Sequence, residues 1–169
     1  LEDGLRPVRA IRFAAQLGFT IDSKTLAAIP QAIHITKKIS IERFRDEFTK
    51  MMVCPTPLSG LRLMEHTGIL NLFIPELAEC RGVEQGSFHH FDVLDHSFLV
   101  CNACPDGMQH LHIRLAGLFH DIGKPSVRKQ TADGCYTFYR HESVSEKMTR
   151  SIMRRLKYAN AEIDKTAHL

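Results

Sequence analysis

His120-Asp121-Ile122-Gly123-Lys124 is the stretch of sequence that most constrains the fold and chemistry of this chain. An adjacent His-Asp pair on a helix can present an imidazole and a carboxylate to one metal ion. An apolar run over residues 115–119 precedes the pair, and Pro125 follows the lysine. The pattern predicts a helix over residues 111–122 that delivers the pair to a divalent-metal site.

Two further histidines have the spacing expected of ligands from neighbouring helices. His96 lies 24 residues before His120, and His141 lies 20 residues after Asp121. We expect His96, His120 and Asp121 to bind the ion, and His141 to be either a fourth ligand or a ligand of a second metal. Any one of these histidines taken alone is better explained as a surface residue, so the inference depends on the whole set.

Other polar residues near these positions have weaker claims on the site. Asp92 or Asp95 is a candidate to orient a ligating imidazole from behind. His89 and His90 are adjacent, so at most one of them can point inward on a regular element, and neither is the favoured choice. Beyond His141, Asp164 and His168 are available as a further ligand, although no clear motif surrounds either.

The His-Asp pair with its flanking histidines resembles the signature of HD phosphohydrolases. The resemblance implies a divalent ion (Mg²⁺, Mn²⁺ or Ni²⁺) that activates water and polarises a phosphoryl oxygen. Lys124 would then balance charge on the phosphate as the transition state forms, although a solvated loop lysine explains it equally well. The predicted catalytic residues are therefore His120, Asp121 and Lys124.

Composition narrows the class of protein. The 169 residues are 44% hydrophobic and carry a net charge of +3, with no apolar run of membrane-spanning length, so no membrane partner is expected. Five cysteines argue against a closed disulfide framework and for a cytoplasmic location, and the Cys101–Cys104 pair is expected to be buried thiols. Basic clusters at residues 6–12 and 150–157 are either solvated helix faces or phosphate-binding surfaces.

Apolar spacing is helical along nearly the whole chain and predicts an all-α fold. Asp22 and Ser40 are candidate N-caps, Gly18 is a candidate helix stop, and Pro30 is a candidate break or kink. Asp133-Gly134 predicts a hairpin over residues 128–139, which holds the only good strand candidates. Two glycines at residues 81–90 indicate a connection between a neck module at residues 1–82 and an HD module at residues 83–169.

The amino-terminal half carries several ordered motifs. Glu2-Asp3-Gly4-Leu5-Arg6 is followed by Arg9-Ala10-Ile11-Arg12-Phe13-Ala14, then by Ile39-Ser40-Ile41-Glu42-Arg43 with Glu47 beyond it. Residues 60–64, 67–70 and 74–77 continue the same pattern. This series resembles class II (bacterial-type) tRNA nucleotidyltransferases, the CCA-adding enzymes and their poly(A) polymerase relatives, many of which carry an HD module on the carboxyl side.

The resemblance implies nucleotide-binding residues at Glu2, Asp3, Arg6 and Arg9. Asp3 and Arg6 would read the Watson–Crick edge of CTP or ATP, because a carboxylate accepts from an exocyclic amine and a guanidinium donates to ring acceptors. Glu2 would hold Arg6 in orientation, and the neck would bind the tRNA 3′ end. Without the surrounding motifs, a charged first helical turn would be the preferred interpretation.

One departure from the family pattern matters. The resemblance implies a separate head domain whose carboxylates bind magnesium, and no D-x-D pattern occurs in this sequence. We therefore expect this polypeptide to be a fragment that does not add nucleotides by itself. The HD module is expected to hydrolyse 2′,3′-cyclic phosphates and phosphomonoesters. A freestanding HD nucleotide phosphohydrolase and a catalytically silent RNA-binding scaffold are the alternatives, and the sequence leaves the metal and the oligomeric state open.

Overall fold

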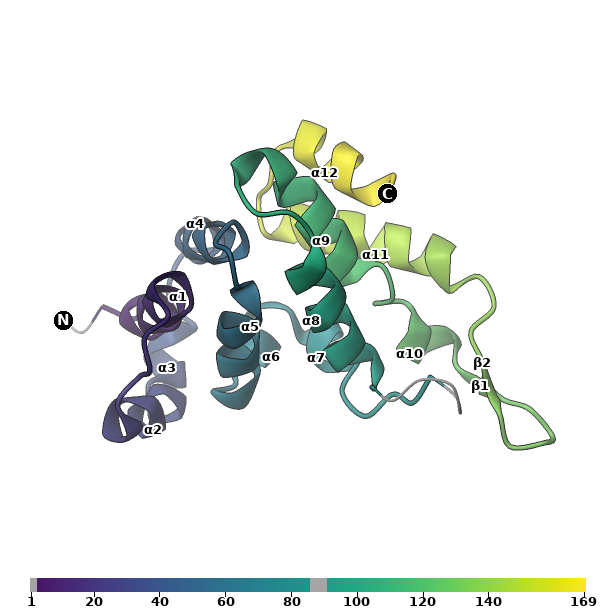
Figure 1. The fold of residues 1–169 in the computed structure, drawn as a ribbon, viewed down its shortest axis with the longest axis horizontal. Helices are drawn as coiled ribbons and strands as arrows, with labels where there is room; N and C mark the ends of the chain where they lie inside the picture. Colours follow the sequence, from purple (N-terminus) through teal and green to yellow (C-terminus); the bar gives the residue numbers. More distant parts are fainter. Residues whose placement is uncertain (1–2, 86–90) are drawn as a thin grey trace.

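The computed structural model describes residues 3–85 and 91–169 and confirms the all-α prediction (Figure 1). The helices are α1 (Arg6–Leu17), α2 (Ser23–Gln31), α3 (Ile33–Thr36), α4 (Ile41–Met52), α5 (Pro57–His66), α6 (Ile69–Phe73), α7 (Pro75–Ala78), α8 (Val93–Ala103), α9 (Leu111–Phe119), α10 (Lys124–Val127), α11 (His141–Arg155) and α12 (Asn160–Ala167), with a 3₁₀ turn at Met108–His110. Strands β1 (Lys129–Gln130) and β2 (Tyr136–Thr137) form the predicted antiparallel hairpin.

Local sequence signals set most of the helix ends. The Asp22 carboxylate accepts from the backbone N–H groups of Lys24 and Thr25, and the Ser40 hydroxyl accepts from Arg43, so both predicted N-caps are confirmed. Gly18 ends α1 in the left-handed region at φ 68°.

One expected helix boundary is shifted by a residue, and another is wrong. Pro30 is the penultimate residue of α2, so the helix ends one residue beyond the expected break or kink. The helix expected at residues 111–122 ends at Phe119, so His120 and Asp121 lie in the turn that follows α9. The turn directs Asp121 inward while the polypeptide changes direction toward α10.

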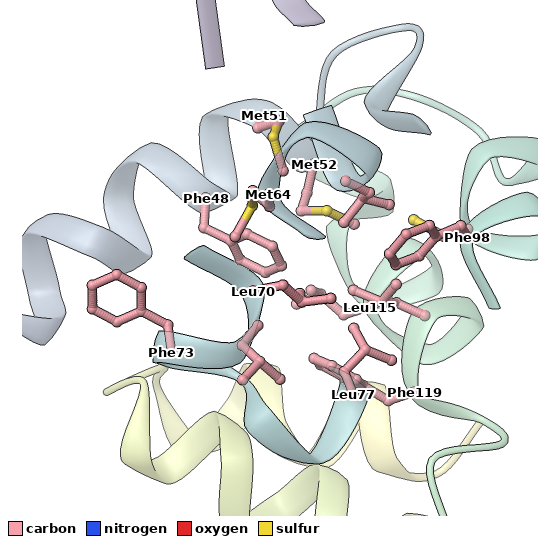
Figure 2. Close-up of a cluster of buried hydrophobic side chains, with 14 of the residues drawn as sticks. Phe48, Met51, Met52, Met64, Leu70, Phe73, Leu77, Phe98, Leu115 and Phe119 are labelled. Atoms are coloured by element: carbon pink, nitrogen blue, oxygen red, sulfur yellow. The ribbon is translucent and has the colours of Figure 1, made fainter. Parts of the chain in front are cut away.

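One hydrophobic core runs through both halves of the chain. On the neck side, Phe44 stacks on Phe73 with ring centroids 3.8 Å apart. Figure 2 shows the buried side chains continuing across the predicted module boundary, from α4 and α5 through α6 and α7 to α8 and α9. The labelled members are Phe48, Met51, Met52, Met64, Leu70, Phe73, Leu77, Phe98, Leu115 and Phe119. The helices that carry the metal-site candidates are therefore packed directly on the neck helices.

Cysteines contribute to this core as thiols. Cys54, Cys80 and Cys101 are buried, Cys104 is half-buried and Cys135 is exposed, and all five are free. Burial raises the pKa of the Cys101 thiol to about 12, so it stays protonated. The expectation of buried thiols holds fully for Cys101 and in part for Cys104. Across residues 3–85 and 91–169, no helix has both the length and the apolar character needed to cross a membrane.

Arg114 of α9 fixes the neck against the second half. The residue is 1% exposed, and its guanidinium donates to the carbonyls of Met52 (2.6 Å) and Cys54 at the end of α4. It also donates to the carbonyls of Cys104 (3.0 Å) and Pro105 (2.9 Å) beyond α8. In the part of the chain that the structure describes, no carboxylate pairs with it. Carbonyls at helix ends carry partial negative charge, so they satisfy this buried cation.

Replacement of Arg114 by Met is expected to lower the free energy of unfolding by about 3 to 5 kcal/mol. The methionine fills most of the volume but leaves the carbonyls without a donor. Urea denaturation followed by circular dichroism measures the change. Arg62→Met, at an exposed arginine of α5, is the matched control and should change stability by less than about 0.5 kcal/mol. Equal stability of the two variants would contradict the role assigned to Arg114.

Candidate metal centre

The structure brings four of the predicted ligand residues to one place. His96 comes from α8, His120 and Asp121 from the turn after α9, and His141 from the first position of α11. Nε2 of His96 lies 3.2 Å from Nε2 of His120 and 3.7 Å from the Asp121 carboxylate. The Asp121 carboxylate is also 3.1 Å from Nε2 of His120 and 3.3 Å from Nε2 of His141. That these side chains bind a metal stays a prediction.

Backbone contacts orient two of these imidazoles for ligation. Nδ1 of His120 donates to the carbonyl of Gly117 (2.8 Å), and Nδ1 of His141 donates to the carbonyl of Phe138 (2.8 Å). Because Nδ1 of each ring is engaged by a carbonyl, Nε2 is the nitrogen that faces Asp121 and is left to bind a metal. Three imidazole nitrogens and a carboxylate suit a divalent transition metal, so the donor set fits the predicted ion.

Gly123 lets α11 approach the His-Asp turn. A Cβ atom at this position would lie 2.8 Å from both the carbonyl oxygen of His141 and the backbone nitrogen of Ser145. The Gly123 N–H instead donates to the Ser145 hydroxyl at 2.9 Å. The glycine therefore allows the contact that holds His141 beside Asp121.

Asp121 is a buried anion held by cations. Its side chain is 4% exposed. Burial alone would raise its pKa, but hydrogen bonds from His120 and Lys124 outweigh burial and hold that pKa far below the usual range. Burial has the opposite effect on an imidazole and would lower the pKa of His120. The hydrogen bond and charge of Asp121 more than offset burial, so the pKa of His120 is raised.

Lys124 lies at the edge of this cluster and is not solvated, with its side chain 13% exposed. Its ammonium group donates to Asp121 (2.7 Å) and to the side-chain oxygen of Gln85 (2.6 Å). Gln85 is buried and was not anticipated from the sequence, because a lone glutamine between two modules carries no motif. The lysine is thus held at the cluster by two oxygen acceptors.

The secondary candidates have other partners or lie elsewhere. Asp92 caps α8 by accepting from the N–H of Asp95, and both carboxylates pair with Arg81 at 2.8 and 2.7 Å. Asp164 pairs with Arg150. His89, His90 and Glu2 fall outside the described residues. His168 is the exposed C-cap of α12.

The two basic clusters are used partly for internal ion pairs. Arg12 is buried against Glu47 (2.9 Å), and Arg155 of α11 pairs with Glu76 of α7. Arg150 pairs with Glu146 as well as with Asp164. Burial against Glu47 contradicts the predicted solvated or phosphate-binding face for Arg12, while Arg150 and Arg155 reach solvent in part and are paired with carboxylates.

Two cavities adjoin the predicted site residues. One of about 580 Å³ lies beside His120 and His141, between α8, α9, α11 and α12. The other, of about 270 Å³, lies in the neck and is lined by both Asp3 and Arg6, but not by Arg9. Arg9 is exposed and faces Phe13 at 5.7 Å. Asp3 binds Arg43 through both oxygens (3.1 Å each), and the N–H of Leu5 also donates to it.

Comparison with known proteins assigns both halves. Residues 18–81 match the family described as the probable RNA- and SrmB-binding site of polymerase A, and residues 93–169 match the HD domain. An A-adding tRNA nucleotidyltransferase of Deinococcus radiodurans is 35% identical over 99% of this chain and 40% of its own length. A CC-adding tRNA nucleotidyltransferase of Thermus thermophilus is 32% identical over 99% of this chain and 41% of its own length. The chain thus spans about two fifths of these relatives. The HD assignment implies a divalent-metal site.

Substitution of a ligand is expected to remove metal binding while the fold persists. Asp121→Asn and His141→Gln should each weaken Mn²⁺ or Ni²⁺ binding by at least about 100-fold, because even outer-shell substitutions cost 10- to 100-fold. Isothermal titration calorimetry measures the affinity. Asp133→Asn in the hairpin and His66→Gln in α5, both exposed, are the matched controls and should bind as the unmodified protein does. Unchanged affinity in Asp121→Asn would place the metal elsewhere.

Proposed function

This chain belongs to the tRNA nucleotidyltransferase family that includes the CCA-adding enzymes, and we propose that it combines metal-dependent phosphoester hydrolysis in its HD domain with nucleotide-base and tRNA binding in its neck. Addition of nucleotides is proposed only for a longer protein that also carries a magnesium-binding head domain. The HD assignment and the RNA-binding family match support the two halves of this proposal separately.

The convergence of His96, His120, Asp121 and His141 carries the hydrolysis proposal. Within the described residues, His96, His120 and Asp121 are the group whose ligand atoms all lie within 4.8 Å of one another. His141 lies on the far oxygen of the same carboxylate. A divalent ion held there would supply Lewis acidity toward a phosphoryl oxygen and acidify water.

The remaining residues would bind and orient the phosphoester. Lys124 keeps its ammonium group at the cluster through Gln85 even if Asp121 engages the metal, so its charge is available to a phosphate oxygen. The adjoining cavity of about 580 Å³ is within the size range of small-molecule sites and would receive the rest of the substrate. Nucleoside 2′,3′-cyclic phosphates and phosphomonoesters are the proposed substrates.

Hydrolysis of 2′,3′-cyclic AMP is expected with Mg²⁺, Mn²⁺ or Ni²⁺ and should stop with EDTA. Asp121→Ala should reduce turnover by at least about 100-fold, while Asp133→Ala, at an exposed hairpin carboxylate, should leave it unchanged. Chromatographic separation of the products measures the rate. Absence of turnover with every metal, despite RNA binding, would favour the silent scaffold over the hydrolase.

The neck would recognise the nucleotide base through Asp3 and Arg6. Both line the same cavity of about 270 Å³, and Arg43 holds the Asp3 carboxylate in place. The hydrogen bond that the Asp3 carboxylate accepts from the Leu5 N–H, together with the charge of Arg43, holds the pKa of Asp3 below its usual range. Asp3 therefore remains an acceptor for the exocyclic amine that CTP and ATP share, while Arg6 donates.

Arg6→Ala and Asp3→Asn are each expected to weaken CTP binding by about 10- to 100-fold, the range for a lost hydrogen bond to a charged group. Arg62→Ala, an exposed arginine outside that cavity, is the control. Equilibrium dialysis with labelled CTP measures binding. Equal binding in all three variants would favour a freestanding HD hydrolase whose neck does not recognise the nucleotide base.

A further inference from the structure

The hairpin region, residues 124–140, carries an excess of positive charge. It holds four basic side chains, Lys124, Arg128, Lys129 and Arg140, against one acidic side chain, Asp133. Its net charge is +3, and Lys129 and Arg140 are exposed, so a polyanion would be attracted to this region.

Aromatic rings are interleaved with these cations. The Arg128 guanidinium stacks 3.7 Å from the Tyr136 ring centroid, and the Lys124 ammonium lies 5.5 Å from that of Phe138. Tyr139 is 79% exposed, the most exposed of the large hydrophobic side chains that the structure describes. The Nε–H of Arg128 is buried from solvent without a hydrogen-bond partner. An exposed ring beside cations is an arrangement that binds single-stranded nucleic acid, since bases stack and phosphates pair.

The hairpin is joined directly to the metal cluster. The Phe138 carbonyl accepts from both the backbone N–H and Nδ1 of His141, at 3.2 and 2.8 Å. Arg140, at φ 63°, turns the chain from β2 into α11 immediately before that histidine. In Figure 1 the hairpin extends from the helices beside α10, at the opposite end of the molecule from α1. A strand lying along it would end at the HD site.

We propose that this hairpin binds the end of a single-stranded RNA, with a base stacked on Tyr139 and phosphates paired with Lys129 and Arg140. The inference rests on the proposed HD hydrolase and narrows its substrate to a phosphorylated RNA terminus, in preference to a free nucleotide. Charge complementarity selects a nucleic acid, and the exposed ring selects an unpaired strand whose bases are free to stack.

Fluorescence anisotropy of a labelled oligoadenylate of about eight nucleotides measures RNA binding by the full chain. EDTA is present, so the result does not depend on hydrolysis. Tyr139→Ala should weaken binding about 5- to 100-fold and leave its salt dependence unchanged. Lys129→Ala should reduce the slope of log affinity against log salt by about 0.7, one phosphate contact. Met108→Ala, 60% exposed on the 3₁₀ turn, should match the unmodified protein.

Binding equal to the unmodified protein in both hairpin variants would overturn the proposal, as would displacement of the RNA by polyglutamate at the same charge concentration. A second measurement separates this inference from the proposed function. Tyr139→Ala should raise KM for an oligonucleotide ending in a 2′,3′-cyclic phosphate and leave KM for 2′,3′-cyclic AMP unchanged. Inactivity toward both substrates with intact RNA binding would reject the hydrolase and keep the hairpin site.

Discussion

The buried guanidinium of Arg114 is the interaction on which the arrangement of this protein depends. It joins the ends of α4 and α8 through carbonyl groups alone, and it projects from α9, the helix that leads directly to His120 and Asp121. A charge this deeply buried is tolerated only where its donors are satisfied, so the three elements must meet in one geometry. The position of the metal-site residues depends on the same geometry, because α8 carries His96.

The sequence was most informative where a short motif forces a local geometry. The His-Asp pair, its two distant histidines and the caps of α2 and α4 could all be anticipated, since each depends on residue type and spacing. Arg114 and Gln85 could not be anticipated: their partners are backbone carbonyls and one lysine, which leave no signature in a single sequence. The end of α9 was also misplaced, because residues 120–122 have ordinary helical character.

The basic clusters show a different limit of sequence reasoning. Arg12, Arg150 and Arg155 belong to clusters expected to be either solvated or phosphate-binding, yet each pairs with a carboxylate distant in sequence. The hairpin was predicted only as a pair of strands, and it holds several cations beside the exposed ring of Tyr139. Whether a basic cluster can bind a ligand therefore depends on its tertiary ion pairs, which residue spacing does not indicate.

The shared core has a thermodynamic consequence for the two halves. Phe44 and Phe73 on one side and Phe98 and Phe119 on the other belong to one buried cluster, and Arg155 and Glu76 pair across the same boundary. A chain with one core is expected to unfold in a single cooperative transition. A ligand that binds one half stabilises the native state of the entire chain by mass action. A metal ion at the HD centre would thus make the distant nucleotide cavity of the neck more resistant to heat, although no residue is common to the two sites.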